Sequence, residues 1–176
     1  MRRTLFTSAV ALVGVVALVV IGAAGGAQAK KPALSATPVF KLHLKPSQEV
    51  PAIKDLKANA VGSVTFDLER SSTGAIISGE VIFYFNYSFP GSVTINGLHI
   101  HQAPKGSAVP TFVVNSGVSS IIDLDGKGNV TTVVTGVTPA TLDAILDNPR
   151  GYYVNLHTSA NPTGALREQM HNPKKR

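Results

Sequence analysis

The sequence predicts an all-β protein, an antiparallel β-sandwich or barrel with one short helix, behind an N-terminal secretory segment. Two observations predict this fold class. At least five segments alternate apolar and polar residues with period two, and clusters of turn-forming residues separate them at short intervals. One further segment repeats its apolar residues at helical spacing. The 176 residues include no cysteine, so strand pairing and apolar burial must stabilise the fold without disulfides.

Residues 1–29 are predicted to be a signal peptide. Arg2 and Arg3 give a positive start, an apolar run continues to about Ile21, and the small residues of Ala27-Gln28-Ala29 favour cleavage after Ala29. The alternative is an uncleaved anchor, because the apolar run approaches the roughly 18 residues of a membrane-spanning helix. Cleavage predicts a protein that is secreted or held in the cell envelope and that has no membrane span.

The rest of the chain reads as one domain with short flanking segments. Residues 30–38 are rich in Lys, Pro, Ala, Ser and Thr and predict a linker, residues 39–170 a β domain, and residues 171–176 a basic tail. Within the first strand, Phe40, Leu42 and Leu44 alternate with polar residues, and Pro46 ends it. The predicted strands cover residues 39–45, 61–70, 75–85, 93–101, 111–114, 118–124, 130–134, 152–157 and 165–170.

Turns and one helix connect these strands. Residues 71–74 form a predicted turn that joins two strands into a hairpin, and residues 125–129 form another turn rich in Gly and Asn. Thr138 is a suitable N-cap and Pro139 suits a first helical turn. Leu142, Ile145 and Leu146 then recur at helical spacing, which predicts a helix over residues 139–147.

Composition excludes several classes of function. Without cysteine there is no thiol chemistry, thiolate metal site or iron–sulfur cluster, and without tryptophan an aromatic sugar-binding platform is disfavoured. The net charge of +6 lies largely at the two ends of the chain, so no nucleic-acid partner is predicted. Motifs for a nucleophilic serine, a phosphate-cradling loop or a dinucleotide site do not occur, so no enzyme activity is predicted.

Three histidines are the predicted metal ligands. His99 and His101 lie two residues apart in a predicted strand and therefore share one face, with Leu98 and Ile100 on the core face. His157 lies on the non-core face of a later strand. If the two strands are close, three imidazoles are a sufficient donor set for zinc or copper, with water in an open position. The competing interpretation is structural, with the imidazoles hydrogen-bonded to nearby backbone carbonyls.

Other polar residues give weaker signals. Glu49 follows the first strand, and Arg167 in the last strand is its candidate partner, although two exposed charges explain both residues equally well. His43 is a lone histidine on the polar face of the first strand, and His171 belongs to the tail. Asn86 and Asn129 each begin a match to the N-glycosylation acceptor pattern, which has meaning only in a host that modifies such sites.

The order of several motifs resembles the CHRD domain, a module named for chordin and found in many exported bacterial proteins. The motifs are, in order, Gln48-Glu49-Val50-Pro51, Leu98-His99-Ile100-His101, Tyr153-Val154-Asn155-Leu156-His157-Thr158 and Asn161-Pro162-Thr163-Gly164-Ala165-Leu166-Arg167. The resemblance spans roughly residues 39–170. It implies an immunoglobulin-like sandwich or barrel, distantly similar to Cu/Zn superoxide dismutase, and it implies Glu49, His99, His101, His157 and Arg167 as recurring residues.

Two departures accompany the resemblance. Ala165 stands where the family usually has an acidic residue, and Glu168 where it usually has glycine, which leaves the role of the last strand open. Fold likeness does not transfer an activity. The sequence therefore predicts first an exported, non-enzymatic module that binds an unidentified extracellular or envelope partner and needs no cofactor. The alternatives are a protein that binds copper or zinc through the three histidines and, less favoured, a dismutase-like enzyme.

Overall fold

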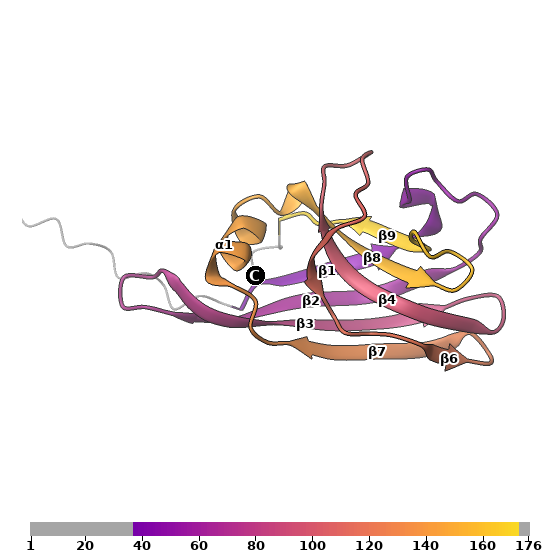
Figure 1. Ribbon diagram of the computed structural model, residues 1–176, viewed down its shortest axis with the longest axis horizontal. Helices are drawn as coiled ribbons and strands as arrows, with labels where there is room; N and C mark the ends of the chain where they lie inside the picture. Colours follow the sequence, from indigo (N-terminus) through magenta and orange to yellow (C-terminus); the bar gives the residue numbers. More distant parts are fainter. Residues whose placement is uncertain (1–36, 173–176) are drawn as a thin grey trace, which may run out of the picture. The chain divides into compact units, whose positions relative to one another are not determined.

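A computed structural model of the chain describes residues 37–172. The predicted signal segment, most of the linker and the last four residues of the tail lie outside these residues. Figure 1 shows two layers of antiparallel strands, so the predicted all-β sandwich with one α-helix is confirmed. Within residues 37–172, no helix combines the length and apolar character that a membrane crossing requires.

The first sheet has the strand order β1-β2-β3-β7. It comprises β1 (Val39–Leu44), β2 (Asn59–Arg70), β3 (Ile76–Ser88) and β7 (Lys127–Val134). β2 and β3 form the long hairpin predicted from the turn at residues 71–74, in which Ser71 N–H donates to the carbonyl of Ala75 at 2.8 Å. β3 continues three residues beyond the predicted end at Phe85, because Asn86, Tyr87 and Ser88 still pair with β7.

The second sheet is built around β4 (Val93–Gln102), which pairs with β8 (Tyr152–Thr158) on one side. On its other side β4 pairs in succession with β6 (Ile121–Asp123) and β5 (Phe112–Asn115). The edge strand β9 (Leu166–Gln169) pairs with β8. β7 begins at Lys127, inside the predicted turn of residues 125–129, because the chain crosses to the other sheet as soon as it passes Gly126.

The predicted helix is confirmed as α1 (Pro139–Asp147). The side chain of Thr138 accepts a hydrogen bond from the Thr141 N–H at 3.2 Å, which satisfies one of the unpaired donors of the first turn. Leu142 and Ile145 are buried, which is the face that helical spacing predicted. Two short 3₁₀ helices complete the elements, η1 (Pro46–Gln48) and η2 (Pro149–Gly151).

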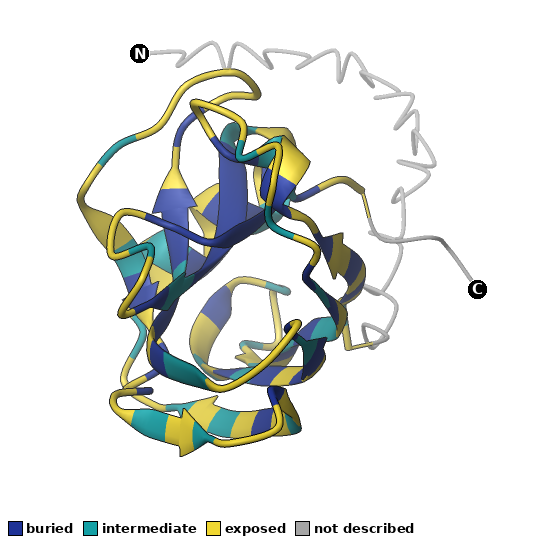
Figure 2. Ribbon diagram, turned by 90° about the vertical axis from the view of Figure 1, so that its right-hand side faces the viewer, coloured by how far each residue is buried: buried dark blue, intermediate teal, exposed yellow. Residues whose placement is uncertain are grey.

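Alternate residues of the strands enclose one apolar core. Figure 2 shows buried and exposed residues alternating along the strands, as expected where one sheet face is covered. Fully buried side chains come from both sheets and the helix, among them Phe40, Phe66, Phe83, Phe85, Ile95, Leu98, Ile100, Leu142, Val154, Leu156 and Leu166. The two asparagines of the glycosylation patterns, Asn86 and Asn129, are exposed and are register partners across β3 and β7.

Candidate metal centre

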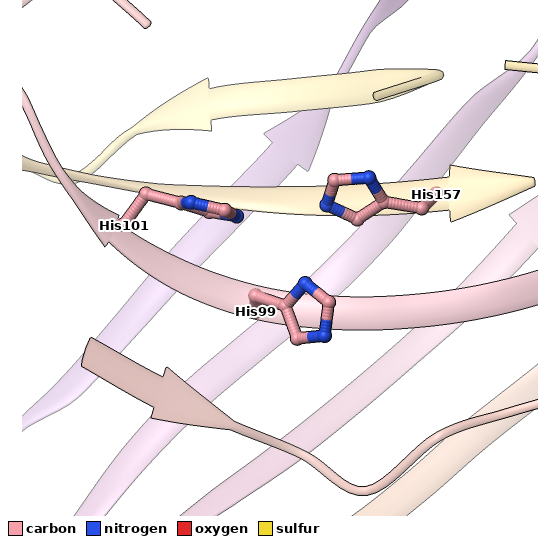
Figure 3. A group of neighbouring side chains, drawn as sticks. All are labelled: His99, His101 and His157. Atoms are coloured by element: carbon pink, nitrogen blue, oxygen red, sulfur yellow. The ribbon is translucent and has the colours of Figure 1, made fainter. Parts of the chain in front are cut away.

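The three predicted histidines lie together on the outer face of the second sheet. In the β4–β8 ladder Gly97 pairs with His157, and His99 with Asn155. Paired residues project to the same face, so His99 and His157 stand on the side opposite the core residue Leu98. One ring nitrogen from each of His99, His101 and His157 lies within 4.8 Å of the other two. Figure 3 shows the three rings turned toward one another from the two neighbouring strands.

Backbone carbonyls fix the orientation of two of the rings. His101 Nδ1 lies 2.9 Å from the Thr111 carbonyl oxygen, and His157 Nδ1 lies 3.0 Å from the Pro162 carbonyl oxygen. A carbonyl only accepts, so Nδ1 carries the hydrogen in each ring and Nε2 holds a free lone pair. Both Nε2 atoms are buried without a hydrogen-bond partner. This pattern, a fixed Nδ1–H and a free Nε2, is typical of histidine ligands.

The ring of His99 occupies the space that Gly97 leaves on the same strand face. A Cβ at position 97 would lie 2.7 Å from His99 Cε1, closer than side chains pack. On its other side the ring stacks on Phe112, with centroids 4.6 Å apart and planes inclined at 23°. Nδ1 of His99 is also buried without a partner. A glycine gap and an aromatic ring therefore hold His99 beside its two neighbours.

Burial keeps the histidines uncharged. Burial, together with repulsion from the nearby His157 and His101 rings when they are charged, lowers the pKa of His99 to about 4. Burial also lowers the pKa of His101 and of His157, while the hydrogen bonds to Thr111 and Pro162 oppose the shift. Neutral imidazole is the form that binds metal, so the cluster is ready to act as a ligand at neutral pH.

Arg167 lies beside the cluster with Glu49 next to it, and both side chains are buried. Arg167 is 2% exposed, and its guanidinium carbon lies 3.6 Å from the centre of the Tyr153 ring. Tyr153 in turn stacks on His101, with centroids 4.9 Å apart and planes inclined at 9°. Burial raises the pKa of Glu49 to about 7, and the charge of Arg167 and the side chain of Asn155 oppose this shift. The interpretation of Glu49 and Arg167 as two exposed charges is therefore wrong.

Loops cover this face, which explains how a polar surface becomes buried. The Tyr153 hydroxyl donates to the Val109 carbonyl at 3.2 Å and accepts from the Val109 N–H at 3.2 Å. Arg167 Nη2 donates to Gln169 Oε1 at 3.3 Å. One atom of each of three buried side chains lacks a hydrogen-bond partner: Glu49 Oε1, Asn155 Oδ1 and Arg167 Nη1.

The sequence profile of the CHRD domain matches residues 40–170, which is most of the chain. The chain belongs to the CHRD domain family. No curated protein and no solved structure matches this CHRD chain. The resemblance stated from the motif order is thereby confirmed, and the residues that it implied are those found around the cluster.

The remaining histidines of the CHRD domain lie elsewhere. His43 is exposed on the outer face of β1, and exposed His171 bonds through Nδ1 to the carbonyl of Gln169 at 3.0 Å. Sequence reasoning gave no supporting role to the residues that hold the ligands in place, namely Gly97, Thr111, Phe112, Tyr153, Asn155 and Pro162. Tyr153 and Asn155 share the strand face of His157, which was a usable signal. Thr111 and Pro162 act through backbone carbonyls, so their side chains carry no signal.

The buried groups predict how stability of the metal-free domain depends on pH. Folding lowers the pKa values of the three histidines. Their neutral rings therefore contribute fully to the stability of the fold above about pH 6.5, and this stability is lost as pH falls toward 4. The pKa of Glu49 is raised from 4.5 to about 7 by burial, so the folded state takes up its proton first and gains stability as pH falls from 7. The two effects oppose each other between pH 7 and 5.

The substitution Glu49→Gln removes the gain in stability that Glu49 gives as pH falls, and it keeps the loss that the histidines cause. The variant should therefore lose more stability between pH 7 and pH 5 than the wild type, by about 1–2 kcal/mol. Urea unfolding at the two pH values, in buffer containing a chelator, measures the difference. Equal losses in both proteins would show that Glu49 is ionised in the folded state at pH 5.

Proposed function

We propose that this CHRD-domain chain is an exported, non-enzymatic module that binds one zinc or copper ion through His99, His101 and His157. The observation that carries the proposal is the convergence of three partnerless ring nitrogens, all within 4.8 Å of one another. Imidazole nitrogen suits both metals, and three such ligands leave a position open for water or for a ligand from a partner. The signal segment at residues 1–29 and the family support export.

The three ring nitrogens lie farther apart than the ligand nitrogens of a site that holds a metal ion. Nitrogens around tetrahedral zinc are about 3.3 Å apart, given Zn–N bonds of roughly 2.0–2.1 Å. Cluster distances up to 4.8 Å mean that the rings would move inward on binding. The fixed Nδ1 bonds of His101 and His157 allow small ring tilts without loss of their carbonyl partners.

A structural role is the second candidate, and the same two carbonyl bonds favour it. His101 ties the Thr111 segment to β4, and His157 ties the Pro162 segment to β8. A purely structural histidine would satisfy both of its nitrogens, however, whereas here the second nitrogen of each ring is buried without a partner. That orphaned nitrogen is the reason for preferring metal binding.

Metal titration of the wild type tests the proposal. The full chain, purified without a polyhistidine tag and treated with a chelator, should bind one Zn²⁺ or Cu²⁺ in calorimetry. Metal at 100 times its Kd should stabilise the fold by about 2.7 kcal/mol, which raises Tm by roughly 10 °C. His43→Ala is the matched control, because His43 is exposed on β1, and it should bind as the wild type does. A wild type that neither binds nor is stabilised by either metal removes the proposal.

Gly97→Ala tests the site without changing a ligand. The added Cβ would meet His99 Cε1 at 2.7 Å, so the ring must turn away from the cluster. Metal affinity should fall about tenfold or more, the range expected when support of a ligand is lost. Gly91→Ala is the control, because a Cβ there has no neighbour within 4 Å. Equal metal affinity in the two variants would contradict the placement of His99 as a ligand.

A further inference from the structure

The cluster of candidate ligands carries no negative charge. Among residues 37–172, the group that could hold a metal ion consists of three imidazoles without a carboxylate. Neutral ligands leave the charge of a bound ion uncompensated. In a partly buried site this costs more for a doubly charged ion than for a singly charged one, because the cost of burying charge rises steeply with charge.

Arg167 adds a buried positive charge to the same side of the sheet. Tyr153 on β8 lies between β4, which carries His101, and β9, which carries Arg167. The guanidinium carbon is 3.6 Å from the Tyr153 ring centre, and this ring is stacked 4.9 Å from the ring of His101. A guanidinium held this close to the stacked rings repels positive charge at the cluster. It will oppose the second charge of a divalent ion in the same way.

The cluster itself offers three ligands. Phe112 stacks on His99 at 4.6 Å, and His101 is 2% exposed. Three nitrogen ligands satisfy Cu⁺, whereas Zn²⁺ normally keeps a fourth ligand. Three ligands that carry no charge therefore favour the ion with the smaller charge and the smaller coordination number.

This inference rests on the proposed metal-binding function. We propose that the three-histidine cluster binds Cu⁺ in preference to Cu²⁺ and Zn²⁺, and that the buried charge of Arg167 sets much of this preference. The ion that this site binds best is thus a soft cation with a single positive charge. Arg167 is a positioning residue, since it acts on the ion through Tyr153 and through its charge and makes no bond to the ion.

The test compares affinities for the two copper ions at pH 8. Cu⁺ affinity is measured anaerobically by competition with a chromogenic Cu⁺ chelator, and Cu²⁺ affinity by competition with glycine. Glu49→Gln and the double variant Glu49→Gln/Arg167→Met form the decisive pair, because they differ by the arginine charge and neither leaves a buried carboxylate without its cation. The ratio of Cu⁺ to Cu²⁺ affinity should fall at least tenfold on loss of the arginine, equivalent to ~59 mV. Arg167→Lys, which keeps the charge, should retain the ratio within threefold.

The outcomes separate this inference from the proposed function. A wild type that prefers Cu²⁺ overturns the Cu⁺ preference, and a double variant with an unchanged ratio overturns the role of Arg167, while metal binding stands in both cases. A wild type that binds no metal overturns both. If the double variant does not fold, the ratio of Cu⁺ to Cu²⁺ affinity in Glu49→Gln is compared with the ratio in the wild type. Removing a negative charge beside Arg167 should raise the ratio severalfold, and an unchanged or lowered ratio counts against the inference.

Discussion

Replacing His101 by alanine should weaken zinc binding by about 100-fold or more. Loss of an outer-shell partner typically costs 10–100-fold in affinity, and loss of one of only three ligands costs more. His101 is the most buried of the three histidines, at 2% exposure, so water replaces its ring poorly. The measurements are calorimetric titration with Zn²⁺ and thermal melts with and without metal. The rise in Tm on adding metal should disappear in the variant.

The same substitution also lowers the stability of the fold itself. A thermal melt without metal measures this loss separately from the loss of metal binding. His101→Ala loses the hydrogen bond from Nδ1 to the Thr111 carbonyl and the stacking on Tyr153. A loss of about 1–3 kcal/mol is expected for leaving a buried acceptor unsatisfied. A variant that loses this stability and yet keeps the full metal-induced rise in Tm would assign His101 a structural role alone. His43→Ala should change neither quantity.

The fold could be predicted because its main signals are local. Apolar residues at every second position mark the buried faces of β1 and β2, and the cap at Thr138 with helical spacing after it marks α1. The strand ends were harder to predict. Asn86 and Ser88 are polar, and they remain in β3 because β7 lies alongside and pairs with them. That pairing is a tertiary contact, which no local pattern contains.

The candidate site could be predicted only in part, for the same reason. That His99 and His101 share a face follows from strand geometry, but the neighbourhood of His157 depends on the register of β4 with β8. A histidine with the ordinary pKa near 6.5 loses metal affinity as pH falls below that value. Burial lowers the pKa of all three histidines, to about 4 for His99, so that loss should begin at lower pH. Burial depends on how the loops after β4 and β8 fold back over the sheet, and the local sequence does not show this.

Replacing Arg167 by alanine should destabilise the metal-free domain by about 3 kcal/mol at pH 8. The side chain is 2% exposed, and the substitution removes its stacking on Tyr153 and its bond to Gln169. It also leaves Glu49, 8% exposed, without the cation that favours its ionised form. Urea unfolding measures the loss. Arg150→Ala is the control, because Arg150 is exposed, and it should stay within about 0.5 kcal/mol of the wild type.

The dependence of this loss on pH and on Glu49 identifies its cause. Arg167 lowers the pKa of Glu49 and burial raises it, so without Arg167 the carboxyl is more readily protonated. The destabilisation by Arg167→Ala should therefore be smaller at pH 5, where Glu49 is neutral in the fold, than at pH 8. Adding Glu49→Gln should recover part of the loss, with a coupling of about 1–3 kcal/mol in the double-mutant cycle at pH 8. Additive effects at both pH values would mean that the two buried charges do not interact, and that Arg167 contributes only through its packing on Tyr153.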